Sequence, residues 1–351
     1  MISFFESQHP AQGEKFISRE GVARQLADNI KAKKFTTIYS APGYGKKSLI
    51  DKALRLLKEE SYPVVAVTLD LFNISCEGDL VAKYIGGMKK HIDEYNRNAM
   101  LPLSIDFENI STNLAINLPH VAAGVTGASY VVYFKEFQNI LSISGGEKLL
   151  KLMESQMAKH SDIAYIVTGE QVNRMKEIFE VKKFFVHTNE NIHLEPLDKA
   201  SCLGYMRNGF LMGGKALEDE TGVAIYNTVK GYPQILNRLC AICDPLALGY
   251  INKKILKSAV DSYFQEQEAL WRYTVSNLTG NQINFLRAVC DGARKFSSSE
   301  TLNKYHLNSS ANVFRLKEAL SKKEIVTFDA EDRAEIIDPM FELWLKKRYF
   351  A

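Results

Sequence analysis

The stretch TTIYSAPGYGKKSLI, residues 36–50, restricts the fold more than any other part of this 351-residue sequence. It joins an apolar run rich in β-branched residues to a segment whose apolar residues recur at helical spacing. Between them stand glycines and lysines in the order typical of a phosphate-binding loop, where backbone N–H groups and a helix N-terminus surround phosphate oxygens. We therefore expect a buried strand, a phosphate-binding turn and a helix, in that order.

The turn matches the consensus G-x-x-x-x-G-K-[ST] only in part. Gly45 and Lys46 match its closing Gly-Lys pair, which assigns Lys46 to the β- and γ-phosphates. Ser40 stands in place of the first glycine, and Lys47 replaces the hydroxyl residue that would bind Mg²⁺. Ser48 comes one residue late, and a shifted register would put Lys46 at a glycine position. A structural turn without a ligand is the alternative interpretation. The nucleotide contacts predicted from the loop are Ser40, Ala41, Pro42, Gly43, Tyr44, Gly45, Lys46, Lys47 and Ser48.

Strand and helix patterns alternate over roughly the first 200 residues, which predicts a doubly wound α/β domain with a parallel sheet. After the loop helix, apolar runs typical of buried strands occur at 62–72, 129–134, 162–169 and 191–197. Residues 101–119 instead alternate between apolar and polar side chains on both sides of a polar turn, which predicts an inserted β-hairpin.

The second half of the sequence reads differently. Strand patterns disappear after Asp198, and helical patterns continue to about Trp271. Three short helical segments, two strands and a closing helix then follow, an order that predicts a winged helix-turn-helix. We expect domains at 1–197, 198–272 and 273–351.

Composition excludes several classes of protein. The net charge of +3 is too small to argue for nucleic-acid binding from bulk charge alone. No apolar run approaches the roughly 18 residues of a membrane span, and the first residues do not resemble a signal peptide, so we expect a cytoplasmic protein. Five cysteines are present, and Cys240 and Cys243 fall three residues apart in an apolar helical pattern. We therefore expect reduced structural thiols and no zinc site.

The order of segments resembles the AAA+-type P-loop ATPases of the archaeal ATPase family, which are related to the STAND signalling ATPases. The likeness rests on KFISREGVARQLADNI, VTLDLFNIS, LEPLDKASCLGYM, KGYPQIL and DPMFELWLKK, and it spans nearly the whole chain. The resemblance implies a P-loop nucleotide-binding domain for ATP or ADP, a helical lid and a winged helix. It also implies that Arg19 lies near the adenine, that Pro233 borders the base, and that Thr168 is a polar sensor.

The family carries D-E-F-Q after its third strand, where this sequence reads K-E-F-Q. By resemblance, Glu136 keeps the position of the catalytic base, while Lys135 replaces the carboxylate that holds Mg²⁺. Two unit charges about 4 Å apart interact by roughly 4 kcal/mol at an effective dielectric of 20, so each lysine would oppose a divalent ion by about twice that. Mg²⁺ binding is therefore doubtful and no metal ligand is predicted, although phosphate oxygens remain attracted to ammonium groups.

Three functions remain open. The first is a nucleotide-responsive switch, a pseudo-ATPase in which Lys47 and Lys135 stand in for Mg²⁺. The second is a nucleotide-independent scaffold that binds protein or DNA. The third is an active ATPase that uses Ser48 or a displaced metal. Arg174 and Arg207 are weaker candidates for a γ-phosphate arginine, and an ordinary surface role is favoured for both.

The expected recognition helix of the winged helix, near 310–324, carries both signs of charge. Arg315, Lys317, Lys322 and Lys323 could meet DNA phosphates, but acidic residues share the helix and the following wing. We therefore favour a protein partner or docking within the chain, with DNA as the alternative.

Overall fold

The computed structural model describes the chain except for residues 1–2, 6–9, 98, 101 and 330. The contacts divide the chain into two compact units, each with its own hydrophobic core. The first unit comprises Arg19–Pro42 and Lys46–Leu194. The second comprises Met1–Ser18, Gly43–Gly45 and Glu195–Ala351.

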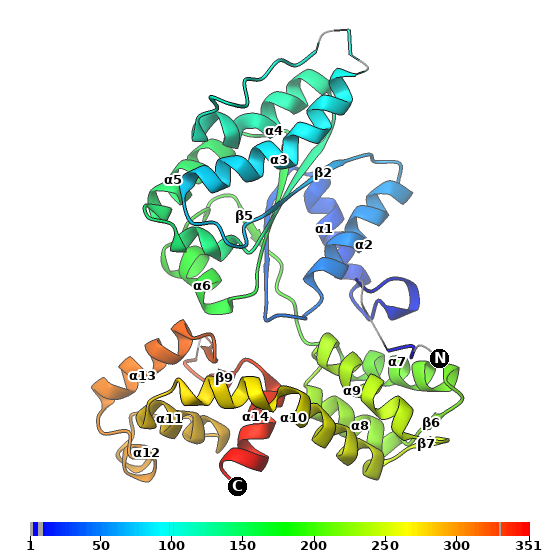
Figure 1. Ribbon diagram of the computed structural model, residues 1–351, viewed down its shortest axis with the longest axis vertical. Helices are drawn as coiled ribbons and strands as arrows, with labels where there is room; N and C mark the ends of the chain where they lie inside the picture. The colour runs from blue at the N-terminus through cyan, green and yellow to red at the C-terminus, as the bar shows by residue number, and fades with distance from the viewer. Residues whose placement is uncertain (1–2, 6–9, 98, 101, 330) are drawn as a thin grey trace. The chain divides into compact units, whose positions relative to one another are not determined.

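A five-stranded sheet in the order β2-β3-β4-β1-β5 forms the centre of the first unit (Figure 1). All four strand pairings are parallel. Every residue of β1 and β4 is buried, as expected for strands covered on both faces. The strands are β1 Phe35–Tyr39, β2 Val65–Asp70, β3 Tyr130–Lys135, β4 Ile163–Gly169 and β5 Asn189–Asn191.

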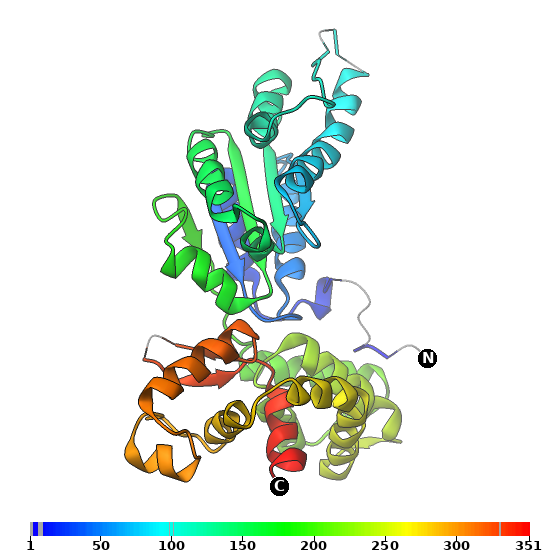
Figure 2. The ribbon, with the colours of Figure 1, turned by 60° about the vertical axis from the view of Figure 1, so that its left-hand side comes forward.

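Helices cover both faces of this sheet (Figures 1 and 2). One face carries α1 Glu20–Lys31 and α2 Lys46–Glu59, and the other carries α3 Glu77–Asn96, α4 Thr112–Thr126 and α5 Gly146–Met157. The remaining short elements of the unit are η2 Phe137–Ser142, α6 Val172–Lys176 and η3 Glu177–Val181. The predicted doubly wound α/β fold of a P-loop NTPase is thus confirmed, including the strand, loop and helix at 36–50.

The β-hairpin predicted at 101–119 is wrong. Residues 102–111 contain no strand, residue 101 lies outside the described residues, and α4 begins at Thr112. The Ser111 side chain caps this helix by accepting a hydrogen bond from Leu114 N at 3.2 Å. The short alternation in the sequence concealed a helical period. The structure forms the helix because the apolar residues of α4 then pack on α3 and the sheet. Buried residues of α4 are Ala115, Ile116, Leu118, Pro119, Ala122 and Ala123.

The strand predicted at 191–197 is also misplaced. The observed strand, β5, ends at Asn191, and Ile192 N makes one more hydrogen bond, to Thr37 O at 2.9 Å. Ile192 and Leu194 are buried, although the chain has left the sheet. The apolar run at 191–197 therefore indicates a buried segment and not a strand.

Helices dominate the second unit, as predicted. Its first part contains η1 Gly13–Lys15, α7 Lys199–Met212, α8 Asp219–Val229, α9 Pro233–Leu246 and α10 Lys253–Ser276. Strands do not vanish entirely after Asp198, because β6 Ala216–Leu217 and β7 Tyr250–Ile251 form a short parallel pair. The N-terminal segment belongs to this unit, where Phe5 packs against Tyr205 and Phe210.

The predicted winged helix is confirmed in the same unit. It consists of α11 Gly280–Cys290, α12 Ser299–Lys304, α13 Ser310–Lys322, β8 Val326–Phe328, β9 Ala334–Ile336, α14 Pro339–Trp344 and η4 Leu345–Tyr349. Strands β8 and β9 form the antiparallel wing. Trp271 and Trp344 are core residues, as expected, with ring centroids 5.7 Å apart.

Cys240 and Cys243 are fully buried in α9, and burial raises the pKa of the Cys243 thiol to about 12. The described part of the chain contains no group of three or more His, Cys, Asp or Glu side chains that could hold a metal ion. Nor does any helix in that part combine the length and apolar character needed to cross a membrane.

Candidate phosphate-binding site

The loop that follows β1 leads directly into α2, which begins at Lys46. Ser40 N donates a hydrogen bond to Gly169 O at 3.4 Å, so the start of the loop is tied to the end of β4. Gly43 and Gly45 have φ of 71° and 92°, the left-handed region that favours glycine. This turn places the amino end of α2 at the carboxyl edge of the sheet, where parallel sheets bind ligands.

Lys46 is the most deeply buried charge of the loop, with 6% of the residue exposed. Its Nζ atom donates to Ser40 O at 2.9 Å and to Ala41 O at 3.1 Å. Burial lowers the pKa of Lys46, and the carboxylates of Glu170 and Glu136 oppose that shift. A buried ammonium held against loop carbonyls is suited to exchange those partners for phosphate oxygens.

Glu170 is a site residue that the sequence prediction missed. Its Oε1 atom lies 3.5 Å from Lys46 Nζ, and its side chain is 41% exposed. It directly follows β4, whose carboxyl end lies beside that of β1 in the sheet. The sequence does contain a signal for Glu170, since it is an acidic residue that directly follows a predicted parallel strand.

Lys135 does not present a free ammonium group. It ends β3 opposite Asp70 at the end of β2, and the two side chains form an ion pair. Burial alone would raise the pKa of Asp70, but hydrogen bonds from Lys135 and from Phe72 N outweigh it, so this pKa is lowered. The lysine that stands where the resemblance expects a carboxylate is thus paired with a carboxylate of the neighbouring strand. Lys47, in contrast, is exposed in the first turn of α2, where Ser48 is half-buried.

Glu136, the predicted base, adopts a left-handed backbone conformation with φ of 54°. Gln138 Nε2 donates to Glu136 Oε2 at 2.7 Å and orients the carboxylate. A residue other than glycine in this conformation stores backbone strain, a feature that clusters at functional sites. Glu136 is also close enough to Lys46 to affect the pKa of that lysine.

The hydroxyl of Thr168, the predicted sensor, is held within the sheet. Its Oγ1 atom donates to Phe134 O at 3.1 Å and lies 3.3 Å from the Tyr133 hydroxyl. Thr168 is only 3% exposed, so it stabilises the junction of β3 and β4. Its role as a sensor remains a prediction.

The other predicted residues are divided between the units. Arg19 precedes α1 in the first unit and is 7% exposed. Pro233 opens α9 in the second unit, which also includes the loop tip Gly43–Gly45. Within that unit, Gly43 O accepts a hydrogen bond from Gln234 N at 3.3 Å, and the rings of Tyr44 and Tyr232 meet edge to face.

The two weaker arginine candidates make ordinary surface contacts. Arg174 donates to Ser142 Oγ at 2.9 Å. Arg207 forms an exposed ion pair with Asp219 at 2.9 Å. The surface role favoured for both arginines from the sequence remains a prediction.

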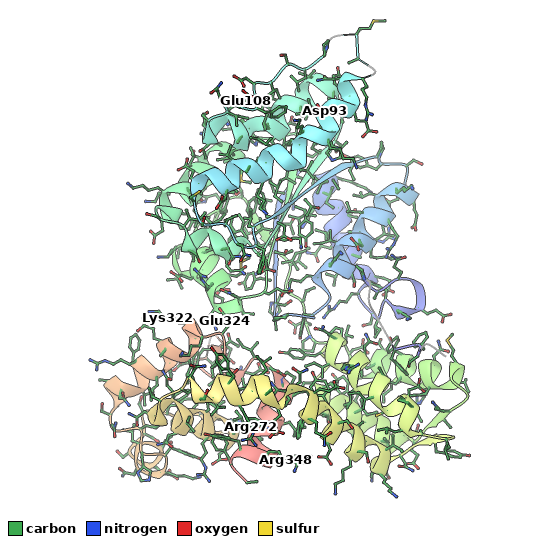
Figure 3. All side chains as sticks on the ribbon, in the orientation of Figure 1. Asp93, Glu108, Arg272, Lys322, Glu324 and Arg348 are labelled. Carbon is green, nitrogen blue, oxygen red and sulfur yellow. The ribbon has the colours of Figure 1, made fainter. Side chains whose placement is uncertain are left out.

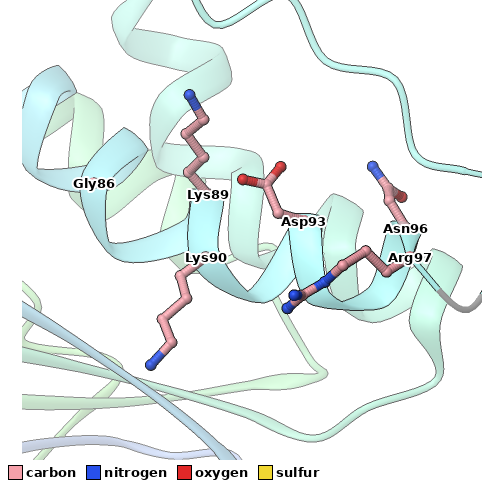
Figure 4. Close-up of a pocket in the computed structure, with 6 residues that line it drawn as sticks. All are labelled: Gly86, Lys89, Lys90, Asp93, Asn96 and Arg97. Atoms are coloured by element: carbon pink, nitrogen blue, oxygen red, sulfur yellow. The ribbon is translucent and has the colours of Figure 1, made fainter.

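A hollow on α3 is a further concentration of charge in the first unit (Figure 4). Its lining residues are Gly86, Lys89, Lys90, Asp93, Asn96 and Arg97. All belong to α3 or its C-cap, and Figure 4 shows Lys89 and Lys90 leaving the helix in opposite directions. The two ammonium groups therefore do not converge on one ligand.

Comparison with known proteins supports the fold. The family described as "Probable winged helix domain" matches residues 269–347. A Walker-type ATPase of Pyrococcus abyssi has a similar structure, with a TM-score of 0.71, 17% identity, and coverage of 97% of this chain and 99% of that chain. The ORC2 protein of Aeropyrum pernix, solved with ADPNP and ADP, has a TM-score of 0.61, 12% identity, and coverage of 99% and 98%.

The ORC1 protein of Aeropyrum pernix in complex with DNA is also similar, with a TM-score of 0.54, 12% identity, and coverage of 99% and 96%. A comparison of the sequence with curated proteins gives no match. At these identities the likeness shows the fold alone, which is that of a Walker-type ATPase with a C-terminal winged helix.

Proposed function

We propose that the chain is a nucleotide-binding switch protein that holds ATP or ADP at the loop between β1 and α2, with weak or absent Mg²⁺-dependent hydrolysis. The observation that carries this proposal is the position of Lys46. Its ammonium is buried at the amino end of α2 beside two loop carbonyls. Backbone N–H groups, the helix N-terminus and this lysine together supply the positive field that a triphosphate requires.

The charge arrangement supports binding more than hydrolysis. In this proposal Glu136 is the residue that could polarise water, and Gln138 positions it. No carboxylate ends β3 to hold Mg²⁺, since Lys135 stands there and pairs with Asp70. Lys47, exposed in the first turn of α2, can neutralise phosphate oxygens without a metal.

Calorimetric titration with ATP and ADP tests this function. We expect micromolar binding in Mg²⁺ buffer that persists in EDTA, and a loss of at least about tenfold in affinity for Lys46→Ala, because a charge-assisted contact is removed. Lys58→Ala, an exposed lysine near the end of the same helix, is the matched control. Absence of binding, or equal binding by Lys46→Ala, would refute the proposal and leave a scaffold.

Docking through the winged helix is a second candidate function. On α13, Phe314 is 69% exposed, an apolar side chain suited to a protein surface. Lys317 is engaged with Asp332 of the wing, and Lys322 pairs with Glu318 at 2.7 Å. Lys322 and Glu324 lie together at the end of this segment, which mixes the two signs of charge (Figure 3). These contacts favour a protein partner over a DNA backbone.

A duplex-DNA titration at several salt concentrations distinguishes the two partners. A protein-docking surface predicts weak binding with a shallow salt slope, and no change for Phe314→Ala. Binding with a steep salt slope that falls in Arg315→Ala would instead establish DNA as the partner.

A further inference from the structure

A cavity of about 230 Å³ lies in the first unit between α2 and the exposed part of the sheet, and it shares Lys47 and Lys135 with the candidate site. Its wall on the helix side comes from Lys47, Ile50, Asp51 and Leu54. The strands β2, β3 and β4 contribute Ala66, Thr68, Val131, Tyr133, Lys135 and Ile166. Lys46, which serves the phosphate loop, does not line this cavity.

The cavity exists because α2 leaves one face of β2 open. Ala66 and Thr68 point away from the buried side of β2 and are exposed, whereas every residue of β1 and β4 is buried. The volume is below the roughly 300–1,000 Å³ of pockets that hold drug-sized ligands. One small molecule therefore fits the space better than a nucleotide does.

The lining combines an apolar wall with two separate, opposite charges. Ile50, Leu54 and Val131 supply aliphatic surface. Lys47 and Asp51 stand four residues apart on α2, but no ion pair joins these two described side chains, and a lysine that precedes its acid is the less favourable order on a helix. The third charge, Lys135, is already paired with Asp70. One cation and one anion thus remain to face a ligand.

The phenol of Tyr133 connects the cavity to the phosphate-site edge of the sheet. Its hydroxyl lies 3.3 Å from Thr168 Oγ1, at the end of the strand that precedes Glu170. The phenol is neutral at physiological pH, and burial raises its pKa further, to about 12. An occupant of the cavity would therefore contact a side chain that is hydrogen-bonded to Thr168.

We propose that this cavity binds a small zwitterion with an apolar chain, the chemical class of the aliphatic α-amino acids. Lys47 takes the carboxylate, Asp51 takes the ammonium group, and Ile50, Leu54 and Val131 cover the chain. These contacts do not involve Lys46, so binding does not require a nucleotide. Because Lys47 is also the proposed counter-charge for phosphate oxygens, an amino acid and a nucleotide would compete for this lysine.

The test uses L-leucine and two half-probes, 4-methylpentanoate and 3-methylbutylamine, with the full chain in calorimetric or ligand-observed NMR titrations. We expect saturable leucine binding, with each half-probe weaker by about tenfold or more, because each lacks one charge-assisted contact. Asp51→Asn should weaken leucine by about tenfold and leave 4-methylpentanoate unchanged. Lys47→Gln should weaken leucine and 4-methylpentanoate and leave 3-methylbutylamine unchanged.

Lys58→Gln, on the same helix outside the cavity, is the control and should bind leucine as the native chain does. Circular dichroism of each variant verifies that it is folded. Two results would overturn the proposal: no saturable leucine binding by the folded native chain up to about 10 mM, or leucine binding that neither Asp51→Asn nor Lys47→Gln weakens.

Discussion

The Nζ atom of Lys46 lies 3.5 Å from the Oε1 atom of Glu170, so a carboxylate competes with phosphate for the central charge of the loop. Glu170→Gln removes this competitor and should raise ATP affinity at pH 7 by about three- to tenfold. The same change removes the largest influence that raises the pKa of Lys46, so that pKa should fall further. ATP affinity in the variant should then decline at a lower pH than in the native chain, because only the protonated lysine attracts phosphate.

Calorimetric ATP titrations from about pH 7 to pH 10 measure both effects. Glu147→Gln is the control, since Glu147 is exposed and pairs with Lys182 instead. Identical pH profiles for the native chain and Glu170→Gln would show that Glu170 does not act on Lys46.

Restoring a metal site tests the charges at the ends of β2 and β3. In the double variant with Lys47→Thr and Lys135→Asp, two carboxylates face each other at 70 and 135, so we expect a lower melting temperature without Mg²⁺. Added Mg²⁺ should raise that temperature and produce Mg²⁺-dependent ATP hydrolysis, with Glu136 as the base.

Lys47→Thr with Lys135→Gln is the matched control, because it removes the same ammonium groups without adding a carboxylate. Its melting temperature should not respond to Mg²⁺. Hydrolysis that stays at the native level in the double variant would argue against a lost metal site.

His160 makes the first unit sensitive to acid. Its Nδ1 atom accepts from the Tyr165 hydroxyl at 2.6 Å, and Nε2 donates to Asn117 Oδ1 at 2.8 Å. Burial, and then the nearby charge of His120, lower the pKa of His160 from 6.5 to about 4, while Asp162 opposes the shift. The unfolded chain therefore binds more protons between these pH values, and stability that is complete above about pH 6.5 is lost as the pH falls toward 4.

Urea unfolding at about pH 7 and pH 5 measures this loss. The free energy of unfolding should fall by about 1 to 2 kcal/mol more in the native chain than in His160→Gln. An equal fall in both proteins would exclude His160 as the cause.

Trp344 anchors the second unit through its shape rather than through a hydrogen bond. It is 1% exposed, packs against Trp271 with tilted rings and stacks on Phe341, and its Nε1 has no hydrogen-bond partner among the described residues. Trp344→Ala should cost about 3 to 5 kcal/mol of unfolding free energy.

Trp344→Phe should cost about 1 kcal/mol, because an unsatisfied N–H is removed together with some packing. Denaturant titration followed by tryptophan fluorescence, through the remaining Trp271, compares the two variants. Equal costs would contradict this expectation, because a phenyl ring at 344 would then recover none of the packing that the alanine variant loses.

The elements that the sequence predicted well are those whose signal is local. The strand, glycine turn and helix at 36–50 each follow from adjacent residues, and the three short helices and wing of the C-terminal region follow from their order. The error at 101–119 arose because the alternation on both sides of a polar turn outweighed one capping residue, Ser111, and the helical period that follows it. Burial of α4 against α3 decided that segment, and such packing between distant residues is not visible in a short window.

In the candidate site, too, residues with a local sequence signal were predicted, and contacts between distant residues were not. Lys46 and Glu136 were predicted from motif positions, and the structure brings both to the carboxyl edge of the sheet. The ion pair of Lys135 with Asp70 could not be predicted, because it depends on the register between β2 and β3. Glu170 was missed because its importance comes from the adjacency of β4 and β1, which are separated by more than a hundred residues of sequence.

The ion pair of Lys135 with Asp70 also restricts which substitutions the sequence can accept during evolution. Replacing Lys135 by an acid while Asp70 remains creates repulsion, and replacing Asp70 alone leaves a half-buried ammonium group without its counter-charge. Either substitution alone therefore destabilises the fold more than the two substitutions together. In homologous sequences, the residues at positions 70 and 135 should therefore covary. A carboxylate at 135 should occur together with a neutral or basic residue at 70.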